Sequence, residues 1–268
     1  MAITTLDGWI ASAKQRVTLK KTATRTTVAL RWFSLFDLAG LPGAGTLAIG
    51  NTANGVVHTD ATAGYPTINT FGGGNAGHIG RCEFSNTVLC RLALYDRLFS
   101  CGAYAFNANT NLASQPSFLG RVPGATAALT AGCTELWAEQ VTTATLVQNV
   151  NVRYTDETGT AGKQTGATAP SAAPTVGSMW QLPCAAGCKG VSLIENVTGT
   201  VASAGTFNVH VMRPLGEVRI GVANETQIMD FIRTGMPQVF DSSALVVIVR
   251  PDSTGAGLVD VTFDVVNG

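Results

Sequence analysis

Strict alternation of apolar and polar residues is the feature that most limits the fold of this chain. The segment 150–154 alternates Val, Val and Tyr with Asn and Arg, and the segments 207–212 and 259–265 repeat the pattern. A period of two is that of a strand with one buried face. Residues 244–249 are apolar throughout, which is typical of a strand buried on both faces. We therefore expect a mainly β body over residues 81–268, built as a β-sandwich or jelly-roll.

Helical spacing of apolar residues is found in two places. After Thr4 and Thr5, either of which can cap a helix, it predicts an amphipathic N-terminal helix over residues 4–19. The residues that carry this spacing are Leu6, Ile10, Ala13 and Val17. A similar recurrence predicts that residues 81–106 are partly helical. Its members are Phe84, Val88, Leu92 and Tyr95.

Residues 1–80 are expected to form an N-terminal region distinct from the β-rich body. Residues 45–80 are rich in Gly, Thr, Ala and Asn, which predicts an extended Gly-rich arm or a long surface loop ordered by a partner. Between Asp7 and Asp37 there is no acidic residue but six Lys and Arg. These cations can bind nucleic acid, dock on an acidic protein or form the solvated face of a helix. The neutral total charge makes nucleic acid the least favoured of these partners.

Charged residues are scarce in this sequence. They make up 13% of the chain, and 17 basic residues balance 17 acidic ones, so the formal net charge is zero. Because a free monomer with so few charges has little protection against association, we expect other subunits to cover much of the surface, as in a homo-oligomer. A neutral monomer with a Ser-, Thr- and Asn-rich surface is the alternative.

Neither a membrane segment nor a secretion signal is predicted. The longest aliphatic run, 244–249, is far shorter than the ~20 apolar residues of a spanning helix. The residues after Met1 lack a basic start followed by an apolar stretch. We therefore expect synthesis in the host cytoplasm, where thiols are reduced.

Motifs for catalysis and cofactor binding are missing from the sequence. It contains no Gly-x-Ser-x-Gly elbow, no His-Glu-x-x-His and no phosphate-binding Gly-Lys-Ser/Thr. The Gly-x-Gly-x-x-Gly match at 72–77 lacks a preceding buried strand, which indicates a flexible loop. We expect the histidines, His58, His78 and His210, at the surface or in turns. The sequence thus predicts a protein that is not an enzyme, with no catalytic, cofactor-binding or metal-ligating residues.

Glu135 and Glu139 would share one strand face with Trp137, a layout that also suits contact with a sugar. Two carboxylates on the same strand do not flank a glycosidic bond from both sides. We therefore favour an outward polar face with one aromatic residue at a subunit contact. Sugar binding and glycoside hydrolysis remain alternatives.

The six cysteines divide into two groups. Four of them lie among apolar or small residues and are expected to be small buried hydrophobes. These are Cys82, Cys90, Cys101 and Cys133. Cys184 and Cys188 flank Ala-Ala-Gly in a tight turn, without further Cys or His at zinc-ligand spacing. We expect free thiols, with a disulfide between Cys184 and Cys188 as the alternative in an oxidising medium.

Several segments together resemble a family of tailed-bacteriophage virion proteins. They are TTLDGWIASAKQRV near the start, FSLFDLAGLPGAGTLA at 33–48, the block from LALYDRLF at 92 to TGTAG at 162, WQLP at 180–183, the run at 194–220 and GMPQVFDSSALVVIV at 235–249. The resemblance covers nearly the whole chain and supplies no catalytic residues. It departs at the turn after WQLP, where Cys184 and Cys188 stand in place of an apolar and a polar or acidic residue. Two changes to cysteine strengthen the disulfide alternative.

The resemblance implies a structural component of a tailed-phage virion, most simply a capsid cement or decoration protein. It implies capsid subunits as partners, a symmetric homo-oligomer such as a trimer, and a location in the virion. A neck, tail or major capsid component is the alternative, and a carbohydrate- or receptor-binding module is the alternative from another class. Aromatic and basic enrichment in the N-terminal region places the partner interface at Trp9, Arg16, Lys20, Lys21, Trp32, Tyr65 and Phe71.

Overall fold

The computed structural model describes residues 5–72, 77–123, 134–147, 149–170, 173–200 and 204–267. These residues form seventeen β-strands, two short α-helices and one 3-10 turn, η1 (Leu119–Arg121). The expectation of a mainly β protein is therefore confirmed. None of the helices in the described part of the chain is long and apolar enough to cross a membrane.

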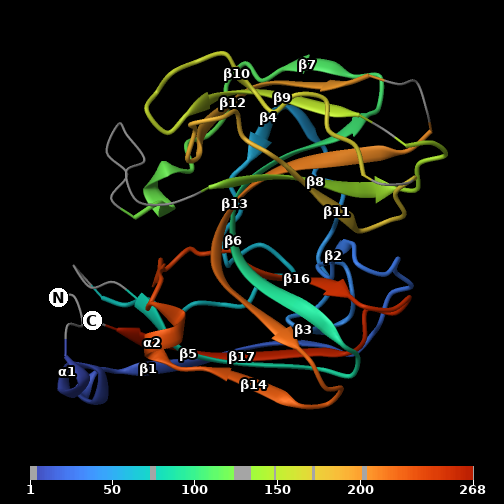
Figure 1. Ribbon diagram of the computed structural model, residues 1–268. Coiled ribbons are helices and arrows are strands. Elements are labelled where there is room, and N and C mark those ends of the chain that lie inside the picture. The colour runs from blue at the N-terminus through green and yellow to red at the C-terminus, as the bar shows by residue number, and fades with distance from the viewer. Residues whose placement is uncertain are drawn as a thin grey trace.

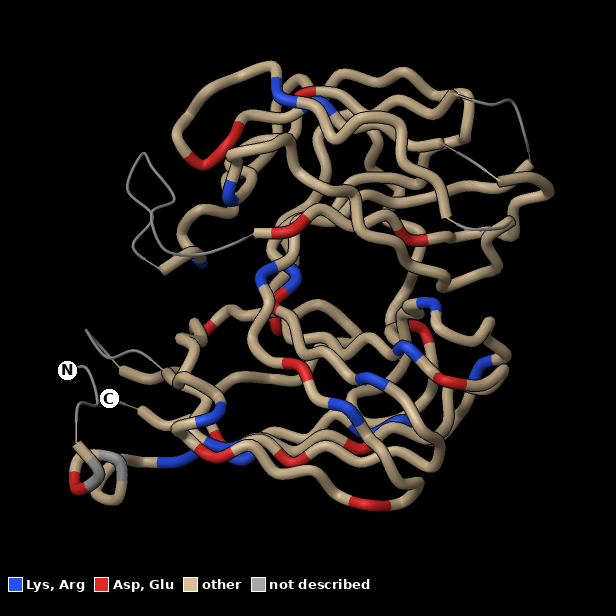
Figure 2. The backbone as a smooth tube through the Cα atoms, in the orientation of Figure 1, with Lys and Arg blue, Asp and Glu red and all other residues tan. Residues whose placement is uncertain are grey.

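Both ends of the described chain lie in one antiparallel sheet, which we call the terminal sheet (Figure 1). Its strands in order are β14 (Thr226–Met229), β5 (Gly77–Asn86), β17 (Val259–Asn267), β1 (Lys14–Lys21) and β3 (Gly40–Leu41), and β15 (Gln238–Val239) also pairs with β5. Helices α1 (Leu6–Ala11) and α2 (Phe231–Thr234) lie at the ends of β1 and β14. Oppositely charged side chains pair along its exposed face, where Figure 2 shows blue and red positions next to each other.

A second sheet, the central sheet, closes on itself. Its order is β13 (Thr206–Ile220), β8 (Glu135–Thr142), β11 (Ser178–Leu182), β2 (Trp32–Ser34), β16 (Leu245–Pro251), β6 (Cys90–Ala105) and β4 (Asn51–Val56). Because β13 also pairs with β6, the first six of these strands form a closed antiparallel barrel. Closure of this kind removes the exposed edges that an open sheet would present.

The third sheet, the outer sheet, covers the other end of the central sheet. It runs in the order β10 (Lys163–Gln164), β9 (Val150–Asp156), β12 (Val191–Gly199) and β7 (Asn109–Asn111). The long strands β6 and β13 pass through both halves of the molecule, so the terminal sheet packs on one half and the outer sheet on the other (Figure 1). We call these halves the lower lobe and the upper lobe, and the barrel interior lies between them.

Strand β6 shows why its sequence is apolar on both faces. Leu92 and Leu94 face the core of the lower lobe, whereas Ala93 and Tyr95 face the barrel interior. Further along, Phe99 enters the core of the upper lobe. A strand covered on both faces has no solvent side, so it loses the alternation that marks a half-buried strand. The prediction that residues 81–106 are partly helical, drawn from the near-helical recurrence of Phe84, Val88, Leu92 and Tyr95, is wrong, because residues 81–86 lie in β5 and residues 90–105 form β6.

The predicted helix over 4–19 is also corrected. The structure has a helix only at α1, with Thr5 as its N-cap, and residues 14–21 form strand β1. Val17 and Leu19 are buried in the lower lobe because β1 pairs along its length with β17. Their two-residue spacing fits a strand, and pairing with a segment from the far end of the chain overrides the local helical spacing.

The segment 45–80 is not an arm extending from the body. It contains β4 and the start of β5, and it buries apolar side chains within the chain's own cores. Among them are Leu47, Tyr65, Ile68, Phe71 and Ile79. The terminal sheet also joins β1 and β3 to strands from beyond residue 81. A division of the chain at residue 80 and a jelly-roll connection of the strands both stay predictions.

Candidate functional site

The barrel interior contains a buried polar network that the sequence did not predict. Ser100 Oγ lies 2.6 Å from His210 Nδ1, and His210 Nε2 lies 2.9 Å from Glu139 Oε2. Arg97 Nη2 lies 3.7 Å from the other Glu139 oxygen. The alternation of β8 and β13 sends Glu139 and His210 inward, because the opposite faces of these strands fill the core of the upper lobe.

Electrostatics fix the protonation of this network. Burial opposes ionisation of Glu139, but Arg97 and His210 outweigh it and bring the pKa of this carboxyl down to about 2. Burial and the nearby Arg97 lower the pKa of His210, so its imidazole is neutral at pH 7. Glu139 and Arg97 therefore form the buried ion pair, and His210 accepts or donates hydrogen bonds as a neutral ring.

A hydroxyl, an imidazole and a carboxylate in this order match the side chains of a nucleophilic triad. Ser100, His210 and Glu139 are each 0% exposed, however, so a substrate has no route to the hydroxyl in this structure. The expectation that His210 lies at the surface is wrong. Closure of the barrel turns what the sequence marks as the polar face of a strand toward the inside.

The same closure corrects the interpretation of Glu135 and Trp137. They do share a strand face with Glu139, but this face is the barrel interior rather than an outward polar face. Trp137 Nε1 donates to Glu135 Oε2 at 2.8 Å, and the Tyr95 hydroxyl lies 3.0 Å from the same oxygen. Trp137 is buried, so its ring cannot serve as a surface platform for a sugar.

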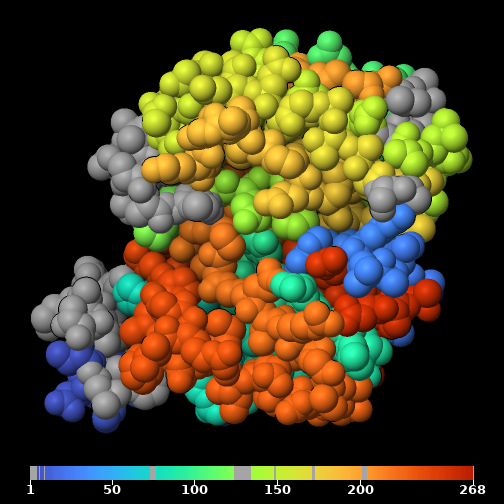
Figure 3. Space-filling view, in the orientation of Figure 1, coloured from blue at the N-terminus to red at the C-terminus, as the bar shows by residue number. Residues whose placement is uncertain are grey.

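Apolar side chains gather instead at one end of the lower lobe, which we call the loop end. Strands β1, β5, β13 and β16 end there, and β6 and β17 begin there, as their registers show. Figure 3 shows N-terminal (blue), C-terminal (red) and intervening segments side by side at this end, on the right of the lower lobe. Six of the twelve exposed large apolar side chains among the described residues lie at this end, in its loops or on the short strand β3. They are Val28, Leu30, Leu41, Leu89, Val222 and Leu258.

Hydrogen bonds join the loops that carry these side chains. The Leu30 N–H donates to the Pro251 carbonyl at 2.7 Å, and the Asp252 N–H donates to the Leu89 carbonyl at 3.0 Å. The Leu258 N–H donates to Thr87 Oγ1 at 2.9 Å. The exposed apolar groups are thus held on an ordered backbone rather than on independent loops.

A hollow of about 380 Å³ opens at the loop end. It is lined by Lys20, Lys21, Thr22, Ser85, Asn86, Thr87, Asn224, Leu258, Val259 and Asp260. The Lys20 ammonium lies 3.1 Å from Asp260 Oδ2. Lys21 is buried, its ammonium donates to the Leu38 carbonyl at 3.0 Å, and burial lowers its pKa. The cations that line the hollow therefore already have partners.

Two further pairs of opposite charge lie at the loop end. Arg91 lies 2.7 Å from Glu217, and Arg219 lies 3.3 Å from Asp252. Each pair is neutral and exposed, so it contributes little to stability but leaves no excess charge. A surface with exposed apolar side chains and balanced charge suits a protein partner better than a polyanion.

The structure brings together only part of the predicted interface. Lys20 and Lys21 line the hollow, and Arg16 lies along the same strand, 3.0 Å from Asp264. Tyr65 and Phe71 are buried in the chain's own cores, which leaves them no surface for a partner. Trp32 is half-buried at the barrel, with its ring centroid 6.1 Å from that of Trp137. The Trp9 side chain lies outside the described residues.

The structure confirms some of the cysteine predictions and leaves the others open. Cys82, Cys90 and Cys101 are buried free thiols, as expected, and burial raises the pKa of each. Cys133 lies outside the described residues. Cys184 and Cys188 are half-buried and free in the structure, so their disulfide stays a prediction.

The sequence analysis missed the apolar residues of the loop end. Leu41, Leu89, Val222 and Leu258 lie at strand ends or in loops, and exposed apolar residues are common on any protein. The available signal was their position at strand ends and in loops. Which turns lie together was not encoded in any local pattern.

Comparison with known proteins gives no family for this chain. No protein-family model and no curated protein matches it. The structure of infectious bursal disease virus Gx strain is 9% identical with a TM-score of 0.17, covering 96% of this chain and 80% of that chain. The VP2 subviral particle of the same virus is 10% identical with a TM-score of 0.17, covering 96% and 80%. TM-scores this low do not establish a shared fold, so the likeness supports no functional conclusion.

Proposed function

We propose that this chain is a non-enzymatic structural component of a tailed-phage virion, a cement or decoration protein that binds capsid subunits through the loop end. The observation that carries the proposal is the gathering of exposed apolar side chains at this end, one of which, Leu258, also lines the hollow. The sequence resemblance to virion proteins and the scarcity of charge support it. Proteins that function as free monomers rarely expose apolar groups together in this way.

The mechanism follows from burial of surface. Leu41 is 61% exposed, and covering a side chain of this kind contributes about 1–2 kcal/mol. Several such side chains, buried together, supply the anchor of an interface, while the paired charges form its rim. A subunit that binds the intact shell but not the ruptured one stabilises the shell by mass action.

The first experiment locates the chain on the particle. Immunogold labelling of purified virions by electron microscopy should show many copies distributed over the shell. Label confined to one vertex would favour a neck or tail component, and a chain that forms shells on its own would favour a major capsid protein. Absence of label from virions would overturn the virion assignment.

The second experiment tests the loop end. Shells that lack this chain are mixed with purified protein and sedimented, and the bound fraction is measured. Leu41→Asp combined with Leu258→Asp should abolish co-sedimentation, because charges would enter the apolar contact. The matched control is Ile228→Asp combined with Ile232→Asp, which places the same charges on exposed side chains of β14 and α2. Equal loss in both variants, or in neither, would refute a role for the loop end.

Further measurements on the purified chain test its oligomeric state and the alternative functions from other classes. Oligomeric state is measured in solution by sedimentation, where a trimer would fit a position on a symmetry axis of the shell. Binding of glycans to the purified chain, unaffected by the loop-end variants, would favour a carbohydrate- or receptor-binding module instead. Polysaccharide turnover lost in Glu135→Gln would overturn the non-enzymatic assignment.

A further inference from the structure

Residues 58–65, which we call the strap, lie at the surface and bury the side chains at their two ends against the barrel interior. His58 is 6% exposed and Tyr65 is 4% exposed, whereas residues 59–64 between them are exposed or half-buried. Within the described part of the chain, the backbone hydrogen bonds of the strap join its own members. The Thr62 N–H donates to the Thr59 carbonyl, and the Tyr65 N–H donates to the Thr62 carbonyl. The strap is therefore attached through side chains rather than through a strand ladder.

Tyr65 fixes one end of the strap. Its ring centroid lies 4.6 Å from that of Phe36, and Arg97 Nη1 donates to its hydroxyl at 3.4 Å. Gly64 packs so closely on Phe36 that an added Cβ would lie 2.6 Å from the ring. Burial raises the pKa of Tyr65 to about 12, so these contacts do not titrate in acid.

His58 fixes the other end, and its contacts depend on the neutral form of the imidazole. Neither ring nitrogen has a hydrogen-bond partner among the described residues, and the ring centroid lies 5.5 Å from that of Tyr65. The charged and titratable groups near this imidazole come from four elements. They are Arg97 on β6, Arg121 in η1, Glu139 on β8 and His210 on β13. The single carboxylate of this set already pairs with Arg97 and His210, so a proton on His58 would create a buried cation with no acceptor.

We propose that the strap is an acid-released cover of the barrel interior, in which protonation of His58 moves residues 58–65 into solvent while the barrel beneath stays closed. The physical cause is the difference between the two positions of the imidazole. In the closed strap, burial and the nearby Arg97 bring the pKa of His58 down to about 3, whereas in water it returns to about 6.5. Between these two values, each unit of falling pH shifts the ratio of open to closed strap about tenfold toward the open form.

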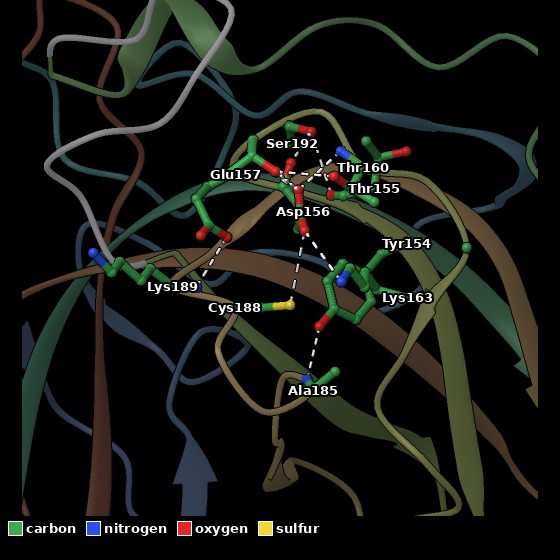
Figure 4. A network of polar contacts seen from close by, with 12 residues as sticks. Tyr154, Thr155, Asp156, Glu157, Thr160, Lys163, Ala185, Cys188, Lys189 and Ser192 are labelled. Carbon is green, nitrogen blue, oxygen red and sulfur yellow. Dashed lines mark hydrogen bonds and ion pairs between the residues drawn. The ribbon is translucent and has the colours of Figure 1, made fainter.

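Two buried carboxylates elsewhere stay ionised while His58 takes up its proton. Burial raises the pKa of Glu139, but Arg97 and His210 outweigh it and hold this pKa at about 2. In the polar group around Asp156, drawn in Figure 4, the Thr158 hydroxyl and the Thr160 N–H donate to the carboxylate and lower its pKa. Acidification from pH 6.5 to pH 4.5 therefore acts on the strap before it reaches these groups.

His210 is also buried and neutral, but its surroundings differ from those of His58. Its Nε2 lies 2.9 Å from a Glu139 oxygen, an acceptor that His58 lacks. An open strap takes the Tyr65 hydroxyl away from Arg97 and uncovers the side of the barrel interior where Glu139 and His210 lie. The proposal does not depend on the role of the chain in a virion.

The test is hydroxyl-radical footprinting of the full chain at several pH values, read by mass spectrometry. Tyr65 and Phe36 are the strap reporters, and their oxidation should rise as the ratio of open to closed strap increases about 100-fold from pH 6.5 to pH 4.5. Phe84 in the lower lobe and Phe207 in the upper lobe are the core reporters and should stay protected. Strap reporters that stay protected at every pH would overturn the proposal. So would oxidation of all four rings together, because the whole chain would then be unfolding.

Two leucine variants assign the response to one imidazole. His58→Leu fills the site with a side chain that takes up no proton, so the strap reporters should stay protected at pH 4.5. The matched control is His78→Leu, since His78 is half-buried in β5 with its Nδ1 3.1 Å from the Met236 carbonyl oxygen, and this variant should respond to acid as the wild type does. Protected core reporters at pH 7 show that each variant is folded. An unchanged acid response in His58→Leu, or an equal loss of response in both variants, would refute the assignment to His58.

Discussion

Replacing Glu139 by Gln should destabilise the fold far more than its small change in shape suggests. Glu139 pairs with Arg97 and His210 inside the barrel, where none of the three is exposed to solvent. The variant leaves the Arg97 guanidinium buried without a counter-charge. Breaking a buried pair in this way costs about 3–5 kcal/mol. The fall in the pKa of Glu139 from 4.5 to about 2 corresponds independently to about 3 kcal/mol.

Urea unfolding of the isolated chain at pH 7 measures this cost. The control is Glu83→Gln, which removes the same charge from a half-exposed pair with Arg81, where the two charged atoms are 2.6 Å apart. A pair of this kind contributes about 0–1 kcal/mol, so the control should change stability little. If Glu139→Gln costs no more than Glu83→Gln, the buried network does not hold the barrel together and the reasoning is refuted.

The same variant has a signature in its pH dependence. Because the pKa of Glu139 is lower in the fold than in the unfolded chain, its contribution is present above pH 4.5 and is lost as the pH falls toward 2. Glu139→Gln lacks this group. The stability curves of wild type and variant should therefore converge in that acidic window and separate above it.

Two further predictions concern single residues. Burial and the neighbouring Arg97 lower the pKa of His58 to about 3, so the folded chain loses stability as pH falls from about 6.5 toward 3, by up to about 1.4 kcal/mol per pH unit. Neither ring nitrogen has a hydrogen-bond partner among the described residues, so His58→Leu should flatten this dependence in urea titrations at several pH values. An unchanged slope would assign the dependence to other groups. Leu19→Ala should cost about 2–4 kcal/mol because Leu19 packs in the lower lobe, whereas Lys20→Ala should cost under about 1 kcal/mol. Similar costs for both would contradict the strand at residues 14–21.

Local patterns predicted the parts of the fold that local geometry controls. The alternating segments became strands β9, β13 and β17, and the apolar run at 244–249 lies largely within β16. In each case the period of two already states which side chains share a face. The three described cysteines expected to be buried are buried, because small apolar surroundings in sequence are enough to indicate a core position.

Long-range pairing decided what the sequence left open. Val17 fits both the helical spacing of Leu6, Ile10 and Ala13 and the strand spacing with Leu19, and pairing with β17 from the other end of the chain decides for the strand. The loop end brings together residues that are far apart in sequence, so no spacing rule could find it.

The sequence by itself determined that this chain is built of strands, since alternation, low charge and turn residues all act locally. The tertiary structure alone decided which faces of those strands meet solvent. His210 alternates with apolar neighbours, and Glu139 is followed by the polar Gln140, as is common for surface residues, yet closure of the barrel encloses both. The sequence of a strand shows which side chains share a face but not which face is covered. The sheets packed on either side determine which face is buried.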